Sequence, residues 1–165
     1  MVPNHLRNTL VADEGLYREM MLHEPMQQVA ALCWRTRPVP EVLLITSLTT
    51  RRWILPKGWP MQNMTLAEAA AREAAEEAGV IGTVDETPLG DYHYLKEKKD
   101  GNALPCRVSV FALAVSGQHR RFAEKGAREL AWLPVQTAAS RVSEPGLRAI
   151  LLDFRRGMQP ARRRA

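Results

Sequence analysis

The sequence predicts an α/β protein, in which a mixed β-sheet lies between helices as an α/β/α sandwich. Short aliphatic runs bounded by turn residues recur along the chain, as expected for strands. An uninterrupted helical pattern occupies residues 66–78, and two further helical patterns follow near the C-terminus. Strands with helices between and after them favour a layered fold with helices on both faces of one sheet.

The strands are expected wherever a short apolar run is flanked by Gly, Pro, Asn, Asp or charged residues. They fall at residues 28–34, 42–47, 53–55, 80–84, 92–96, 107–115 and 129–133. Residues 35–40 contain two prolines and form a hairpin-like connection. Pro56 ends the third strand, because proline has no amide hydrogen to donate to a sheet.

The clearest helix covers residues 66–78, which contain no Gly or Pro. Thr65 and Glu68 form a T-x-x-E capping box before it, and Gly79 follows where a left-handed C-cap is favoured. Later helices are expected at residues 135–142 and 145–155, and a short one around residues 13–22.

Length and composition predict one compact enzyme domain. A chain of 165 residues with 45% hydrophobic content can bury a proper core but has little room for two domains. We assign residues 27–156 to this domain, 1–26 to an N-terminal extension and 157–165 to a basic tail. Cys33 and Cys106 lie in apolar runs without metal-binding spacing, so they are expected to be reduced core residues. No run of ~20 apolar residues and no secretion signal occurs, which predicts no membrane contact and a cytoplasmic location.

The formal net charge is +5 although one helix is acidic, so positive charge is concentrated elsewhere. Basic residues cluster at residues 51–57, 96–99 and 120–128 and in the tail, which favours a small polyanionic ligand. The arginines of the tail are more typical of a frayed end than of a nucleic-acid reader, and nucleic acid is not expected as a partner. The sequence does not indicate an oligomeric state.

Three carboxylates share one face of the helix at residues 66–78. Glu73, Glu76 and Glu77 fall within an arc of roughly 100°, with alanines on the neighbouring and opposite side. Alanines let the helix approach its support closely, which gives the carboxylates a rigid mount. Clustered carboxylates repel one another unless a cation neutralises them, and Mg²⁺ binds such oxygens together with phosphate. A solvated Glu/Ala helix has the same composition, so the pattern alone leaves both interpretations open.

The order of residues 58–80 resembles the signature of the Nudix hydrolases. That signature is Gly, five residues, Glu, seven residues, Arg-Glu, an apolar residue, any residue, Glu-Glu, any residue, Gly and an apolar residue. The residues in register are Gly58, Arg72, Glu73, Ala74, Glu76, Glu77, Gly79 and Val80. Met64 departs from the signature, because the family has Glu there, mainly as a support for the helix and the arginine.

The flanking segments extend the resemblance over residues 27–155. The stretches QVAALCWR, EVLLITS, RRWILPKGWP and ARELAWLPVQTA are similar to the diphosphoinositol polyphosphate phosphohydrolase-like branch, many of whose members also cleave diadenosine polyphosphates. Two features depart from this branch: Lys57 replaces a common glycine, and Thr49 and Thr50 stand where inositol-directed relatives carry a basic residue. The resemblance implies the Nudix sandwich and an enzyme that hydrolyses pyrophosphate linkages.

The resemblance also implies the site. Glu73, Glu76 and Glu77 would bind Mg²⁺, with Mn²⁺ as a substitute, and the carbonyl of Gly58 would be a further ligand. Arg72 would orient Glu73. Basic residues before the metal loop, and on the strand at residues 92–96 that borders the cleft, are candidates for phosphate contacts: Arg51, Arg52, Lys57 and Lys96.

Two assignments stay open from the sequence. The general base is Glu77 or a carboxylate outside the helix, Glu124 or Glu129. Glu124 can also be an ordinary solvated loop residue, and Glu129 can also be a residue that orders the next strand. Glu68 either replaces the missing family Glu as a partner of Arg72, four residues further on, or only completes the capping box.

Three functions are compatible with these residues. The first is a Mg²⁺-dependent hydrolase of a diphosphate linkage, preferably in dinucleoside polyphosphates or inositol pyrophosphates. The second is a nucleoside triphosphate or RNA 5′-end pyrophosphohydrolase, and the third is a nucleotide-binding Nudix domain without turnover. The intact carboxylate set argues against the third, because a pure binding module does not need it.

Overall fold

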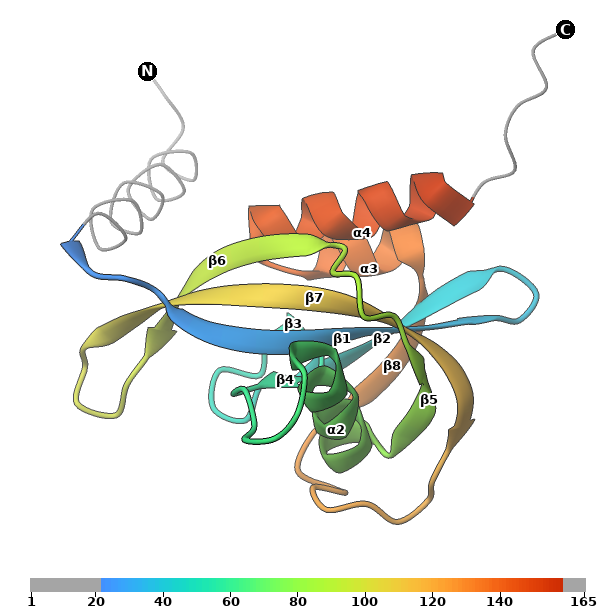
Figure 1. The fold of residues 1–165 in the computed structure, drawn as a ribbon. Helices are drawn as coiled ribbons and strands as arrows, with labels where there is room; N and C mark the ends of the chain where they lie inside the picture. Colours follow the sequence, from blue (N-terminus) through green and yellow to red (C-terminus); the bar gives the residue numbers. More distant parts are fainter. Residues whose placement is uncertain (1–21, 159–165) are drawn as a thin grey trace, which may run out of the picture.

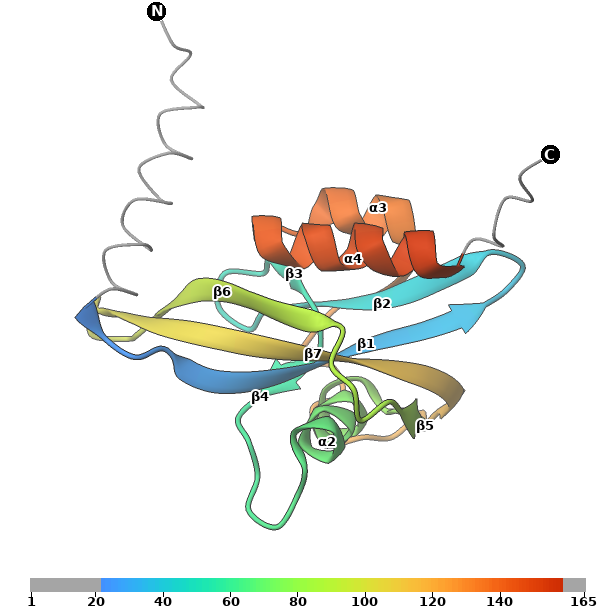
Figure 2. The ribbon, with the colours of Figure 1, turned by 45° about the horizontal axis from the view of Figure 1, so that its top comes forward.

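The structure is a computed structural model that describes residues 22–158. In this range a mixed sheet carries α2 (Leu66–Ala78) on one face and α3 (Val135–Arg141) and α4 (Pro145–Met158) on the other, as Figures 1 and 2 show. The predicted α/β/α sandwich is therefore confirmed. The helix expected around residues 13–22 lies outside the described residues, apart from its last position.

The sheet has eight strands within the described range, and its two central strands run parallel. The main path has the order β3-β2-β1-β7-β5, with β4 beside β1, β6 beside β7 and β8 beside β2. β1 and β7 are parallel, whereas the other paired strands are antiparallel, so the sheet is mixed as predicted. The strands are β1 (Met26–Thr36), β2 (Pro40–Thr46), β3 (Trp53–Ile54), β4 (Lys57–Gly58), β5 (Val80–Val84), β6 (Gly90–Glu97), β7 (Ala103–Gln118) and β8 (Leu130–Pro134).

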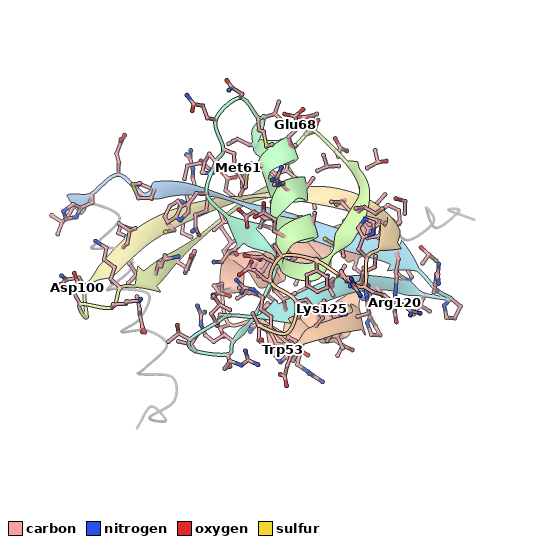
Figure 3. All side chains as sticks on the ribbon, turned by 90° about the horizontal axis from the view of Figure 1, so that it is seen from below. Trp53, Met61, Glu68, Asp100, Arg120 and Lys125 are labelled. Carbon is pink, nitrogen blue, oxygen red and sulfur yellow. The ribbon has the colours of Figure 1, made fainter. Side chains whose placement is uncertain are left out.

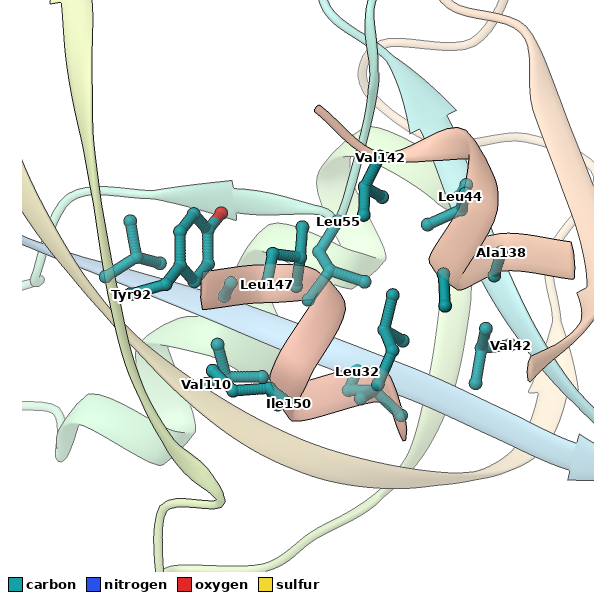
Figure 4. Close-up of a cluster of buried hydrophobic side chains, with 14 of the residues drawn as sticks. Leu32, Val42, Leu44, Leu55, Tyr92, Val110, Ala138, Val142, Leu147 and Ile150 are labelled. Atoms are coloured by element: carbon teal, nitrogen blue, oxygen red, sulfur yellow. The ribbon is translucent and has the colours of Figure 1, made fainter. Parts of the chain in front are cut away.

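Alternation along the strands divides the apolar side chains between two cores. On β1, Leu32 belongs to the core under α3 and α4, whereas Ala31 and Cys33 belong to the core under α2. Figure 4 shows the first core, where Leu147 of α4 packs above the sheet. Both faces of β1 are buried, which explains why its sequence is a continuous apolar run. Cys33 and Cys106 are buried and unbridged, as predicted.

Helix α2 has the caps that its sequence predicts. The Thr65 hydroxyl accepts the Glu68 N–H at 3.1 Å, and the Glu68 carboxylate accepts the Thr65 N–H at 2.8 Å. Gly79 has a φ of 69° and ends the helix in the left-handed region. The buried residues of α2 are mainly alanines, so the helix lies close to the sheet. Among residues 22–158, no helix combines the length and apolar character needed to cross a membrane.

Strand β4 forms where the sequence predicts a loop. Its two residues pair with β1, Lys57 opposite Ala30 and Gly58 opposite Val29. The Ala31 N–H also donates to the Pro56 carbonyl at 3.0 Å. Such a short strand has no signal of its own in the sequence, because it is held by its neighbour. The pairing fixes Gly58 against the sheet below α2.

Candidate active site

A cleft of about 840 Å³ opens between the acidic helix and the basic part of the sheet. Its walls come from the β2–β3 loop, β4, α2, β6, Arg128 and the residues just before α4. Figure 3 looks onto the face that carries α2: Met61 and Glu68 lie near the start of the helix, and Arg120 and Lys125 mark the loop beside its end. A backbone hydrogen bond joins that loop to the end of the helix, since the His119 N–H donates to the Gly79 carbonyl at 2.8 Å.

Glu73 and Gly58, two predicted metal ligands, are in direct contact in this cleft. A Cβ built on Gly58 would lie 2.2 Å from a carboxylate oxygen of Glu73, so any larger residue here would displace that carboxylate. Burial raises the pKa of Glu73, and the charges of Glu76 and Glu124 raise it further. This end of the cleft therefore concentrates negative charge.

Glu77 is buried beside them, with 5% of its surface exposed. One carboxylate oxygen accepts the backbone N–H of Lys57 at 3.1 Å, and the other accepts the guanidinium of Arg128 at 3.2 Å. Burial raises the pKa of Glu77 to about 7, although Arg128 and the Lys57 N–H act in the opposite direction. The carboxyl group is thus fixed in orientation, and its charge is costly at this position.

Arg128 is a buried residue of the cleft that the sequence did not single out. Its side chain is 8% exposed, and besides Glu77 it donates to the Thr46 carbonyl at 3.0 Å and to Glu124 at 3.5 Å. Its Nε is buried and has no hydrogen-bond partner among residues 22–158. Arg128 therefore ties α2 to the end of β2. It stands 51 residues after Glu77, so only its basic charge was visible in the sequence.

Arg72 and Glu76 pair with each other and do not line the cleft. Arg72 Nε donates to the Glu76 carboxylate at 2.7 Å, whereas the resemblance predicted that Arg72 orients Glu73. Glu68 is engaged with the start of the helix, so the structure has it as a cap rather than as a partner of Arg72. The position of the missing family Glu is taken by Met64, which is 38% exposed.

Lys57 and Lys96, both predicted to contact substrate, line the same cleft. Lys57 Nζ donates to the Tyr94 hydroxyl at 3.0 Å, and Lys96 Nζ lies 5.3 Å from the ring centroid of Trp59. Burial lowers the pKa of Lys57 to about 8, and the charge of Lys96 adds to the effect. The structure brings these two ammonium groups to one part of the cleft.

Arg51 and Arg52 are placed differently from each other. Arg52 lines the cleft but is ion-paired with Glu144, a buried residue immediately before α4. Arg51 donates to the Ala127 carbonyl at 3.0 Å and is not part of the cleft lining. Of these two predicted contacts, only Arg52 faces the site.

The residues fit a hard divalent cation, although no group of three His, Cys, Asp or Glu side chains within residues 22–158 already converges on one point. The side-chain donors are carboxylates, the absence of a Cβ on Gly58 lets the Glu73 carboxylate lie against its backbone, and burial together with neighbouring carboxylates raises the pKa of Glu73. Glu76 and Glu77 are each turned toward an arginine. Both would have to rotate for all three carboxylates to reach one ion.

The candidates for the general base separate in the structure. Glu124 lies near Glu73 and Glu77, whose pKa values it helps to raise. Glu129 instead exchanges hydrogen bonds with Thr46, with its N–H donating to the hydroxyl at 3.0 Å and its carbonyl accepting the Thr46 N–H at 3.1 Å. These backbone contacts place Glu129 just before β8, whereas Glu77 and Glu124 are the candidates whose charges lie close to Glu73.

Comparison with known proteins identifies the family. The model of the NUDIX domain matches residues 26–154. Nudix hydrolase 12, mitochondrial, of Arabidopsis thaliana is 34% identical over 126 residues, which cover 74% of this chain and 62% of that protein. Diphosphoinositol polyphosphate phosphohydrolase 3-beta of Bos taurus is 34% identical over 91 residues, covering 54% of this chain and 51% of its own length. A crystal structure of an Ap4A hydrolase from C. elegans matches with a TM-score of 0.58 at 19% identity, over 81% of this chain and 97% of that one. The chain therefore belongs to the Nudix family.

Proposed function

We propose that the chain is a Mg²⁺-dependent pyrophosphohydrolase that cleaves a diphosphate linkage, with dinucleoside polyphosphates or inositol pyrophosphates as preferred substrates. The observation that carries the proposal is one cleft that is lined by both carboxylates and cations. Glu73 and Glu77 line it together with Gly58, and so do Lys57, Lys96 and other basic residues. A substrate for such a cleft carries phosphate that can bind a metal ion and a basic surface at the same time.

Hydrolysis of a pyrophosphate linkage needs both the carboxylates and the cations of the cleft. A pyrophosphate linkage is inert because its negative oxygens repel a nucleophile, so a catalyst must neutralise them. Glu73, Glu76, Glu77 and the Gly58 carbonyl would hold Mg²⁺, which would supply charge neutralisation and help to align water. Arg128 contacts both Glu77 and Glu124, and one of these two carboxylates would accept a proton from the attacking water.

The named activities of similar proteins support this choice. The Bos taurus relative is a diphosphoinositol polyphosphate phosphohydrolase, and the C. elegans protein of similar fold is an Ap4A hydrolase. The chain spans 62% of the length of the Arabidopsis relative. Activity and substrate are therefore proposals for this chain, and the cytoplasmic location stays a prediction.

The test is a substrate panel with Mg²⁺, in which release of phosphate or of shortened nucleotides is measured. The panel contains diadenosine polyphosphates, inositol pyrophosphates, nucleoside triphosphates, ADP-ribose and 5′-triphosphate RNA. We expect the highest kcat/KM for the first two classes. A higher kcat/KM for nucleoside triphosphates or 5′-triphosphate RNA would favour the alternative enzyme. Nucleotide binding without any turnover would favour a regulatory domain.

A further inference from the structure

We propose that Lys57 and Lys96 form a phosphoryl subsite that reads a phosphate beyond the two of the cleaved linkage, and that Tyr94 is the positioning residue that fixes Lys57 in it. This inference rests on the proposed function and deepens it. It assigns the preference for longer polyphosphates to two lysines, rather than to the basic charge of the chain as a whole.

A buried chain of hydrogen bonds holds Lys57. The Tyr94 hydroxyl donates to the Gln28 side-chain oxygen at 2.6 Å and accepts from Lys57 Nζ at 3.0 Å. Gln28 is 1% exposed and Tyr94 is 6% exposed, so both side chains are largely shielded from bulk water. Because an ammonium group has three N–H donors, the bond to Tyr94 leaves donors for a ligand in the cleft.

Lys96 extends the same surface. Tyr94 and Lys96 are two residues apart on β6, so both side chains project from one face of the strand, about 6.5–7 Å apart along it. The Lys96 ammonium is steadied against the ring of Trp59. A phosphoryl group accepts hydrogen bonds through several oxygens, so it can bind two neighbouring ammonium groups at once. Two neighbouring ammonium groups also repel each other, and a bound anion relieves that repulsion.

Lys57 connects this subsite with the carboxylates of the cleft. Its backbone N–H bonds Glu77, and its ammonium lies at Tyr94 on β6, so the length of one lysine side chain separates the two contacts. A substrate that binds at both places carries phosphate at the Lys57 ammonium in addition to the phosphate near Glu73 and Glu77. Arg52 is already paired with a buried carboxylate, which leaves lysines as the better phosphate donors of this cleft. Among the lining lysines, Lys57 and Lys96 are the two whose ammonium groups lie over aromatic rings.

The test compares Tyr94→Phe with Tyr92→Phe. Tyr92 is a buried tyrosine two residues earlier on the same strand, and it packs in the core under α4 instead of lining the cleft. The readout is the ratio of kcat/KM for diadenosine tetraphosphate to kcat/KM for ADP-ribose, which has only two phosphates. Tyr94→Phe should lower this ratio roughly tenfold through KM, the usual effect of one hydrogen bond to a charged group. Tyr92→Phe should leave the ratio unchanged.

A double-mutant cycle separates positioning from general stability. Lys57→Met should lower the same ratio, and adding Tyr94→Phe to Lys57→Met should lower it no further. Equal losses on both substrates, or an undiminished effect of Tyr94→Phe in the Lys57→Met background, would overturn the assignment. If Tyr94→Phe fails to fold, the Lys57→Met variant tests the subsite by itself, and an unchanged kcat/KM ratio in that variant would overturn the subsite.

A binding measurement keeps this inference distinct from the proposed function. Inorganic tripolyphosphate is titrated calorimetrically into wild type and Lys57→Met in EDTA, where turnover is not required. If the wild type hydrolyses nothing but binds tripolyphosphate roughly tenfold more tightly than the variant, the proposed function fails and the subsite stands. Equal affinities in the two proteins would overturn the subsite whatever the activity.

Discussion

Replacing Glu77 with Gln should stabilise the metal-free protein relative to the wild type as the pH rises. The pKa of Glu77 is raised from 4.5 to about 7 in the folded chain, chiefly by burial. A carboxyl with a higher pKa folded than unfolded binds more protons in the folded state, so wild-type stability falls as the pH rises through that window. With 1.36 kcal/mol for each pKa unit, the fall between about pH 5 and about pH 8.5 amounts to about 2.5 kcal/mol. The Glu77→Gln variant would escape this loss, because its amide does not titrate.

The assay is urea unfolding in EDTA at several pH values for wild type and Glu77→Gln. Glu76→Gln is the matched control, because it removes one charge from the same helix at a partly exposed position. After correction by this control, the stability of Glu77→Gln relative to wild type should increase steadily with pH. A difference that stays constant, or that moves in the opposite direction, would refute the conclusion that a costly buried charge sits at Glu77.

Gly58→Ala puts a Cβ into the Glu73 carboxylate and should lower kcat/KM about 100-fold while circular dichroism shows an intact fold; near-normal turnover would contradict the close contact. Glu68→Ala should lower the free energy of unfolding by about 1 kcal/mol through loss of the capping box, with kcat unchanged. Adding Met64→Glu should not alter that kcat, because Arg72 is already paired on its own helix, and a gain of activity would revive the idea that Glu68 orients Arg72. Affinity should rise with phosphate number and fall with ionic strength, and the prediction fails if ADP-ribose is a better substrate than every compound with four or more phosphates.

The acidic helix could be predicted almost completely, because all of its signals are local. Thr65, Glu68 and Gly79 fix its ends through contacts within a few residues, and the alanine pattern predicts its buried side. The main strands were also visible as apolar runs. Strand β4 was not, since two residues become a strand only when β1 lies beside them.

The contacts that shape the cleft could not be predicted from the sequence, because they join residues that are far apart along the chain. Arg128 meets Glu77 across 51 positions, and Tyr94 meets Gln28 across 66. Basic and acidic residues are plentiful, so their types alone do not select a partner. The partner of Arg72 was missed for a different reason: neighbouring carboxylates on one helix compete for it, and the rotamer decides between them.

Metal-dependent turnover at Glu73 is tested most directly by hydrolysis of diadenosine tetraphosphate after EDTA treatment, with Mg²⁺ titrated back into wild type and Glu73→Gln. We expect the wild type to be inactive until Mg²⁺ is added. At saturating Mg²⁺, Glu73→Gln should be slower by orders of magnitude, with an unchanged circular dichroism spectrum. Full wild-type activity without a divalent ion, or near-normal turnover in Glu73→Gln, would contradict the assignment of this cleft as the active site.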